Sequence, residues 1–117
     1  MAETSLDLVR GTLDLLILKS LVWGPLHGYA IATSIRRRTE DALLVEEGAL
    51  YPALHRLEAR GWIESQWGLS EKNRHAKYYE LTREGRRRLQ AAVKTWEKYA
   101  SAVGKILSAT SPVGDES

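Results

Sequence analysis

The stretch EEGALYPALHRLEARGWI, residues 46–63, decides the fold. Its apolar residues recur with the spacing of an amphipathic helix. The stripe that we expect to be buried consists of Leu50, Ala53, Leu54 and Leu57. The opposite face carries Tyr51, Pro52, His55, Arg56 and Ala59. That mixture of aromatic, basic and small side chains is unusual for a face that only meets water, so the face needs another explanation.

Two residues of this stretch are unusual in a helix. Pro52 is compatible with a helix that begins near Ala49, because the backbone N–H groups of the first turn have no intrahelical partner. Glu46 and Glu47 lie at the N-terminal end, where the helix dipole favours negative charge. Gly61 is placed to end the helix as a left-handed residue.

Two helical segments precede this stretch. Residues 6–23 carry an apolar stripe, and LDLLILKSLV (13–22) is apolar around most of its circumference. Such a helix is usually buried on more than one side. WGPLHG (23–28) interrupts it with two glycines and a proline, and a second helix is predicted from Tyr29 to Arg38.

Two strand-like runs follow the stretch. WIESQW (62–67) alternates, with Ile63 and Trp67 on one face. In AKYYELT (76–82) we place Tyr79 and Leu81 on one face and Lys77 on the other. The polar segment GLSEKNRH (68–75) is predicted to be the loop of a hairpin. The order of helices, terminating glycine and hairpin predicts a winged helix-turn-helix.

A long helix is predicted for residues 83–108. Thr82 is a natural N-cap, whereas Gly85 is unfavourable in a helix and leaves room for a start one turn later. The apolar residues then recur at alternating spacings of four and three, which is the a/d seam of a coiled coil. The seam consists of Leu89, Val93, Trp96, Ala100, Val103 and Leu107.

The seam has no second helix of its own kind in the chain, so we expect a partner to cover it. The alternative is that this helix and the first one pack on each other within one protomer. The predicted fold class is mainly α with a small β-hairpin, a winged helix-turn-helix followed by a long C-terminal dimerisation helix. The expected divisions are 1–82 for the winged helix-turn-helix with the N-terminal helix, 83–108 for the dimerisation helix and 109–117 as a disordered tail.

Composition excludes several classes of protein. The 117 residues include no cysteine, so a disulfide scaffold and a thiolate zinc site are excluded, and a cytoplasmic location is expected. Glu3 and Asp7 occupy the region where a signal peptide needs basic residues. No uncharged apolar run approaches the ~20 residues that span a bilayer, so we expect no membrane partner.

The net charge of +2 is small, but basic residues gather in short strips at 35–38, 72–77 and 83–88. Such strips are typical of a protein that touches a polyanion at chosen places, although any one strip could be ordinary solvated surface.

Three blocks of sequence strongly resemble the PadR family of transcriptional regulators. They are GTLDLLILKSLVWGPLHGYAI (11–31), EEGALYPALHRLEARGWIES (46–65) and KYYELTREGRRRL (77–89), in the order and spacing of the family. The resemblance covers residues 8–108, and the single C-terminal helix is similar to the family's small subgroup. It implies a homodimeric repressor that binds double-stranded DNA at an inverted-repeat operator.

The resemblance also implies that the C-terminal helix packs with the partner's N-terminal helix. The apolar circumference of the first helix supports this arrangement. The expected dimer interface consists of Leu13, Leu16, Leu89, Val93, Trp96, Ala100, Val103 and Leu107.

The predicted DNA contacts lie on the opening stretch and on the hairpin. From the helical wheel and the resemblance, the recognition helix contributes Tyr51, Pro52, His55 and Arg56. Arg56 could read guanine or clamp phosphate, His55 could donate to either, and Tyr51 could bind phosphate or lie against sugar. The wing contributes Lys72, Arg74, His75 and Lys77, which we expect to contact the DNA backbone or the minor groove.

The sequence departs from the family pattern at two positions. NRHA (73–76) stands where many members have a Gly-Arg pair before the two tyrosines, and Ala49 stands where Thr or Ser is usual. A hydroxyl contact to DNA is therefore missing at residue 49. Both departures concern the path of the wing and the preferred operator sequence rather than the class of protein.

An effector site is predicted around Trp96, in the middle of the seam. One interpretation is a tryptophan that fills the dimer interface. The other, which the resemblance to drug-responsive members supports, is a stacking surface for a small aromatic or hydrophobic effector. The residues expected to line such a site are Trp96, Val93, Tyr99, Ala100, Leu15 and Leu18.

Two other classes of function were considered. An enzyme is disfavoured because His27, His55 and His75 fall on a turn, a helix and a wing, with neither catalytic nor metal-ligand spacing. We therefore expect no catalytic residue, no metal and no cofactor. The remaining alternative is a winged helix used only for contact with proteins.

Overall fold

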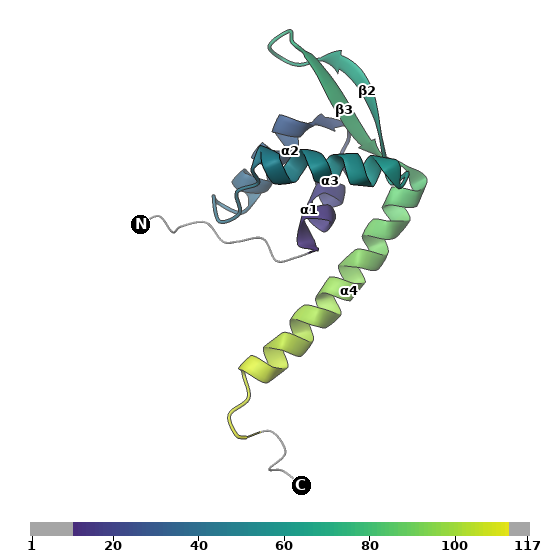
Figure 1. Ribbon diagram of the computed structural model, residues 1–117. Coiled ribbons are helices and arrows are strands. Elements are labelled where there is room, and N and C mark those ends of the chain that lie inside the picture. The colour runs from purple at the N-terminus through teal and green to yellow at the C-terminus, as the bar shows by residue number, and fades with distance from the viewer. Residues whose placement is uncertain (1–10, 113–117) are drawn as a thin grey trace.

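The computed structural model of the chain describes residues 11–112. Four helices and three strands follow one another along this part of the chain. They are α1 (Thr12–Ser20), β1 (Leu26–His27), α2 (Gly28–Arg38), α3 (Glu47–Ala59), β2 (Ile63–Leu69), β3 (His75–Leu81) and α4 (Arg83–Leu107). Figure 1 shows the first three helices gathered below the sheet, while α4 leaves this body as a single projecting helix. The predicted fold class is confirmed.

The core forms where α1, α2 and α3 meet the base of the hairpin. The predicted buried stripe of α3 is confirmed, since each of its four residues is at most 1% exposed. The side chains that meet this stripe come from the other two helices and from β2, and they include Ile17, Leu21, Ile31, Ile35 and Ile63. Burial of this apolar surface is what holds the three helices together.

The three strands form an antiparallel sheet in the order β1-β3-β2. The strands β2 and β3 are the predicted hairpin, each extended toward a short loop at residues 70–74. β1 was not predicted, because two residues carry no periodicity, and it pairs Leu26 with Tyr79 and His27 with Tyr78. His27 caps α2, since its Nδ1 accepts a hydrogen bond from the Ala30 amide at 3.2 Å.

The helix α3 begins two residues earlier than predicted. Glu46 is its N-cap and Glu47 its first residue, so Pro52 lies in the second turn and not in the first. The helix therefore lacks the hydrogen bond that residue 52 would give to the carbonyl of Gly48, an exposed residue. Its C-terminus is as predicted: Gly61 has a φ of 78°, and the Gly61 and Trp62 amides donate to the carbonyls of Glu58 and Leu57.

The expected placement of Lys77 was wrong. Side chains of a strand alternate with a period of two, so Lys77 shares its face with Tyr79 and Leu81. The structure confirms this, because the Lys77 Nζ lies 3.8 Å from a carboxylate oxygen of Glu58 on α3. The opposite face of β3 carries Tyr78, whose hydroxyl donates to the Leu69 carbonyl.

A close junction joins the end of α3 to the start of α4. Thr82 is the N-cap that the sequence predicted, and its Oγ1 accepts from the Gly85 amide at 2.9 Å and donates to the Gly61 carbonyl at 2.7 Å. Gly85 does not delay the helix, which begins at Arg83. The residue instead allows close packing, because a Cβ at this position would overlap the Trp62 carbonyl oxygen.

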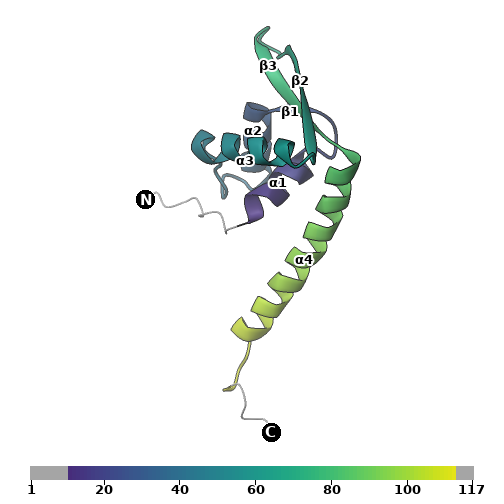
Figure 2. The ribbon, with the colours of Figure 1, turned by 45° about the vertical axis from the view of Figure 1, so that its right-hand side comes forward.

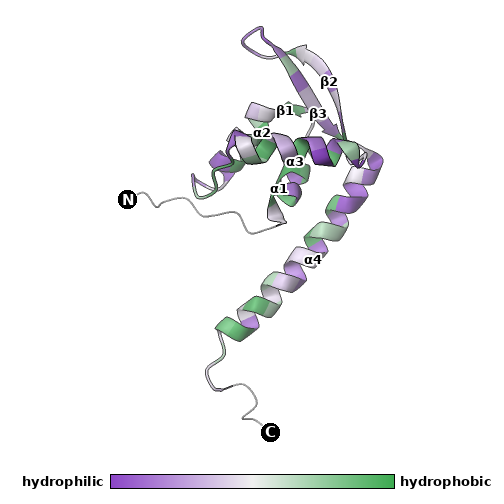
Figure 3. Cartoon of the chain, in the orientation of Figure 1, coloured by the Kyte–Doolittle hydropathy of each residue, from purple (hydrophilic) through white to green (hydrophobic). Residues whose placement is uncertain are grey.

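The predicted seam of α4 divides into two parts. Leu89 is buried in the protomer core and Val93 packs against that core. Beyond Val93, the seam is exposed, and Leu107 at its end is 78% exposed. Figures 2 and 3 show the C-terminal half of α4 standing clear of the body, with its last turns hydrophobic.

Two expectations concern the ends of the chain. The first predicted turn of the N-terminal helix, up to residue 10, lies outside the described residues, as do the last five residues of the tail. Residues 109–112 form no helix or strand. Among the helices between residues 11 and 112, none has the length and the apolar character to cross a membrane.

Candidate nucleic-acid interface

The outward face of α3 is exposed along its whole length. Tyr51, Pro52, His55, Arg56 and Ala59 all point away from the core, with Tyr51 44% exposed. The face is flanked by the N-terminus of α2 on one side and by the hairpin on the other (Figure 1). A helix with one free face beside a free hairpin has the geometry needed to lie in a DNA groove.

Arg56 has a partner within the protomer. Its guanidinium donates a hydrogen bond to a carboxylate oxygen of Asp14 on α1 at 2.6 Å. The two side chains are 45% and 24% exposed, so the pair lies at the surface and is screened by water. Arg56 therefore remains accessible, but Asp14 competes for its charge.

Tyr51 is positioned by a glycine of α2. A Cβ added to Gly28 would lie 2.7 Å from the Tyr51 hydroxyl oxygen, which is too close for any other residue without movement of the ring. The ring therefore lies against the first residue of α2, and its hydroxyl sits between the two helices. The sequence analysis did not identify this contact, because nothing in the sequence shows that Gly28 lies against Tyr51.

The tip of the hairpin is positive. Lys72, Arg74 and His75 are exposed, and none of them forms an ion pair within residues 11–112. The loop is closed by hydrogen bonds between Ser70 and Arg74 and by Asn73 at a φ of 62°. This closure holds Lys72 and Arg74 at the end of a two-stranded arm.

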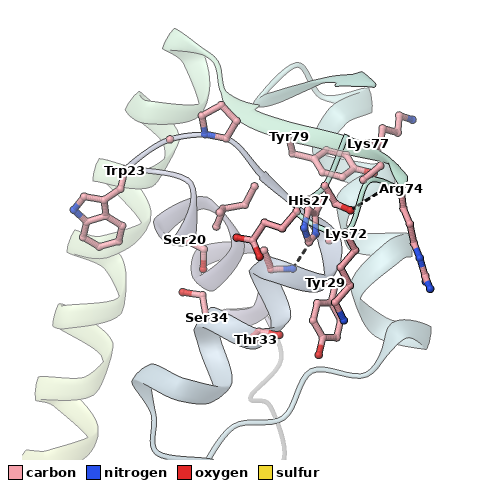
Figure 4. Close-up of a pocket in the computed structure, with 18 of the residues that line it drawn as sticks. Ser20, Trp23, His27, Tyr29, Thr33, Ser34, Lys72, Arg74, Lys77 and Tyr79 are labelled. Atoms are coloured by element: carbon pink, nitrogen blue, oxygen red, sulfur yellow. Dashed lines mark hydrogen bonds between the residues drawn. The ribbon is translucent and has the colours of Figure 1, made fainter. Parts of the chain in front are cut away.

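A groove of about 1420 Å³ runs between α2 and the hairpin. Its cationic lining comes from both walls: Arg37 and Arg38 from α2, and Lys72, Arg74 and Lys77 from the hairpin and its loop. Among residues 11–112, Glu71 is the one carboxylate of this lining. Figure 4 shows Tyr29 of α2 together with Lys72 and Arg74 of the hairpin loop among the residues that line the groove. The groove is therefore suited to an anion.

The sequence reasoning missed the residues of α2 that line this groove. Tyr29, Thr33 and Arg37 lie four residues apart on α2 and form one stripe. That spacing was available in the sequence, but only the packing of the hairpin shows that the stripe faces other functional residues. Trp67 of β2 also lines the groove and was also missed as a candidate.

The predicted effector residues are only partly grouped. Trp96 and Tyr99 lie on α4 with ring centroids 6.2 Å apart, and both are exposed together with Ala100. Val93 and Leu15 are partly buried against the core. Leu18 does not fit the prediction, because it is 2% exposed and packed inside the protomer core. Its side chain cannot reach an effector without unfolding α1 from that core.

The predicted dimer residues divide in the same way. Leu13 and Leu16 on α1 are partly buried against the core, while Trp96, Ala100, Val103 and Leu107 on α4 are exposed. Leu89 is 7% exposed and belongs to the core of its own protomer, so we remove it from the predicted interface. The helices α1 and α4 touch within the protomer, but this contact leaves the distal half of α4 uncovered.

One tyrosine beside the site has a perturbed acidity. Burial raises the pKa of the Tyr79 hydroxyl, and the nearby Glu58 carboxylate adds to the shift by disfavouring a second negative charge. The phenol therefore stays neutral over the physiological range. No group of three metal-binding side chains of the His, Cys, Asp or Glu type occurs among residues 11–112.

Comparison with known proteins gives a consistent result. Residues 17–91 match the profile of the transcriptional regulator PadR-like family. A protein of Lysinibacillus sphaericus, named Uncharacterized protein X, is 34% identical over 90 residues, which are 77% of this chain and 83% of the relative. A solved transcriptional regulator from Clostridium thermocellum is 34% identical with a TM-score of 0.75, covering 82% of this chain and 93% of its own.

A second solved structure is a PadR family transcriptional regulator from Eggerthella lenta. It is 35% identical to this chain with a TM-score of 0.74, and the match covers 86% of each chain. The sequence and the fold thus lead to the same family.

Proposed function

The chain belongs to the PadR-like family of transcriptional regulators, and on this premise we propose that it binds an inverted-repeat DNA operator as a homodimer. Members of this family are transcriptional regulators and not enzymes, so the expectation that the chain is no enzyme is confirmed. Because a regulator of transcription acts on DNA, we propose that the protein is located in the cytoplasm.

The observation that carries the proposal is the exposed face of α3 beside the cationic hairpin tip. A helix placed in the major groove presents its outer side chains to base edges, and a hairpin beside it reaches the backbone or the minor groove. Here the exposed α3 residues are Tyr51, Pro52, His55 and Arg56, and the exposed lysine, arginine and histidine residues of the hairpin are Lys72, Arg74, His75 and Lys77. We assign contact with bases or backbone of the major groove to the first set, and contact with the backbone or the minor groove to the second.

The dimer is supported by the exposed seam of α4. A large apolar surface on a projecting helix is costly in water, and a second protomer can cover it. Two recognition helices related by a two-fold axis address two half-sites of opposite orientation, about one helical turn apart. The operator is therefore proposed to be an inverted repeat.

The experiment that tests DNA binding is selection of bound fragments from genomic DNA, followed by a gel shift at ~50 and ~200 mM salt. We expect enrichment of fragments that share an inverted repeat, with affinity that falls steeply as salt rises. No binding at ~50 mM salt would instead favour a winged helix used for contact with proteins, because backbone contacts dominate affinity at low ionic strength.

We further propose that the regulator is a repressor that a small aromatic or hydrophobic effector releases from the operator. The support is the exposed ring pair of Trp96 and Tyr99 on the helix that is proposed to form the dimer. An effector stacked there would alter the relation between the two protomers, and through them the spacing of the recognition helices. Tryptophan fluorescence titration of the unchanged protein and of Trp96→Ala with planar hydrophobic compounds is the test. Unchanged affinity in Trp96→Ala would show that the effector does not bind at Trp96.

A further inference from the structure

Trp67 of β2 is unlike the other tryptophans of this chain. It is 69% exposed, and its side chain takes part in no hydrogen bond, ring contact or cation–π contact within residues 11–112. The other three each contact another side chain: Trp23 with Arg38, Trp62 with Arg88 and Trp96 with Tyr99. A bare indole on a two-stranded arm exposes a large apolar surface to water.

The position of Trp67 follows from the alternation of β2. Ile63 at the base of the same face is buried in the core, and Ser65, the next residue on this face, donates a hydrogen bond to Glu58 of α3 at 2.6 Å. Trp67 lies one pleat further out, where the hairpin has left the core. Its partner across the hairpin is Lys77, which carries a charge on the same face.

The groove that Trp67 lines is the one between α2 and the hairpin. Its walls carry Arg37 and Arg38 on one side and Lys72, Arg74 and Lys77 on the other, and Glu71 is the one acidic side chain of the lining in the described part of the chain. Its volume of about 1420 Å³ exceeds the roughly 300–1,000 Å³ that is usual for a site for one small molecule. An open groove with cations on both walls fits a polyanionic strand better than a compact ligand.

We propose that this groove receives one sugar–phosphate strand of the operator and that Trp67 makes an apolar contact to its deoxyribose or to an adjacent base. The cations on the walls neutralise the phosphates, while the indole covers the apolar part of the same strand. This inference rests on the proposed DNA binding and adds to it a residue that contacts DNA without charge. It also gives Tyr29 and Tyr51, which line the same groove, positions beside that strand.

The two kinds of contact differ in how they respond to salt. Each cation that neutralises a phosphate releases a counterion, which makes affinity fall as salt rises. An apolar contact releases no counterion, so its contribution is the same at every salt concentration. A loss of affinity that is independent of salt is therefore the signature of the role proposed for Trp67.

The test compares variants of the full chain on a selected operator across a range of salt concentrations. Trp67→Ala is expected to weaken binding by about tenfold at every salt concentration and to leave the salt slope unchanged, whereas Trp67→Phe retains most of the affinity. Lys72→Ala is the contrasting variant, because loss of a phosphate contact should make the dependence of log affinity on log salt less steep. Gln66→Ala is the matched control, because Gln66 is exposed on the neighbouring position of β2 and points to the other face of the hairpin.

The outcomes separate this inference from the proposed function. Absence of binding by the unchanged protein would overturn both. Normal binding by the unchanged protein with unchanged affinity in Trp67→Ala would overturn the Trp67 contact alone. Sedimentation of Trp67→Ala is measured in parallel, and a shift from dimer to monomer would also overturn the contact, because Trp67 would then belong to an interface between copies of this chain.

Discussion

The guanidinium of Arg56 in α3 is bonded to the carboxylate of Asp14 in α1 at 2.6 Å, although the two residues lie 42 positions apart in the chain. This pair ties the middle of the proposed recognition helix to the first helix. It also means that Arg56, a residue proposed to contact DNA, has an internal anionic partner. DNA binding by Arg56 must therefore exchange Asp14 for a base or a phosphate.

Removal of that partner is expected to strengthen DNA binding. Asp14→Asn keeps the shape of the side chain but frees the charge of Arg56, and we expect ~2- to 5-fold tighter operator binding at low salt, because a surface pair contributes about 0.2–1 kcal/mol. The free energy of unfolding should change by no more than about 1 kcal/mol. Fluorescence anisotropy with labelled operator and urea unfolding measure the two quantities.

The matched variant is Arg56→Ala, which should weaken binding and relax the base preference at one position of each half-site. Weaker binding by Asp14→Asn would show that Asp14 orients Arg56 for DNA and does not compete for it.

The hairpin cations are expected to differ in their share of the salt dependence. Lys72→Ala and Arg74→Ala should each reduce the slope of log affinity against log salt by about 0.9, because each removes one phosphate contact. Lys77→Ala should reduce it by less, since Lys77 is already 3.8 Å from a Glu58 oxygen. Binding titrations at four salt concentrations give the slopes. An unchanged slope in all three variants would contradict the assignment of the hairpin to the backbone.

The exposed seam of α4 predicts how the dimer can be broken. Val103→Asp places a charge in the seam and should convert the dimer to monomer at micromolar concentration, with loss of operator binding. Ser101→Asp is the control, because Ser101 is exposed on the same helix but lies outside the seam. Sedimentation velocity measures the mass of each species. A dimer that persists in Val103→Asp would place the interface elsewhere.

Two glycines of α4 are expected to respond in opposite ways to a methyl group. Gly85→Ala should destabilise the protein by about 1–3 kcal/mol or more, because the added Cβ overlaps the Trp62 carbonyl and forces the junction of α3 and α4 apart. Gly104→Ala should stabilise it by about 0.5–1 kcal/mol, since a Cβ there meets nothing within 4 Å and alanine favours a helix. Urea unfolding monitored by circular dichroism compares both variants with the unchanged chain.

The raised pKa of Tyr79 predicts a loss of stability in alkali. Its phenol is neutral in both folded and unfolded protein below its unfolded pKa of about 10, so its contribution is complete there. As the pH rises toward the higher folded pKa, the unfolded chain ionises first and that contribution is lost. Between pH 8 and a pH above about 10, the free energy of unfolding should decrease less for Tyr79→Phe than for the unchanged protein. Equal decreases in the free energy of unfolding would show that ionisation of Tyr79 does not cause the loss of stability in alkali.

Several local features could be predicted from the sequence because their physical causes lie within a few residues. The apolar spacing of residues 50–57 identified the buried side of α3, and by elimination its exposed side. Gly61 as the terminating residue and Thr82 as the cap of α4 were also predicted. Each depends on local backbone geometry or on helix periodicity. The motif order was then enough to predict the fold class and the family.

Features that depend on contacts between distant residues could not be predicted from the sequence. The two-residue strand β1 exists because β3 pairs with it, and no periodicity marks it. Leu18 was expected at an effector site, but it is buried because α2 and α3 complete the core around α1. The residues that line the groove likewise could not be predicted, because the groove forms only when α2 and the hairpin pack side by side.

The sequence by itself thus determined which of the longer segments form helices and strands, which face of α3 is free and which family the chain resembles. Only the tertiary structure decided that Arg56 bonds to Asp14, that Gly85 lies against the Trp62 carbonyl and that Trp67 lines a cationic groove. The reason is physical. Periodicity and capping act over one or two turns of chain, whereas these contacts arise from how three helices and a hairpin pack around one core.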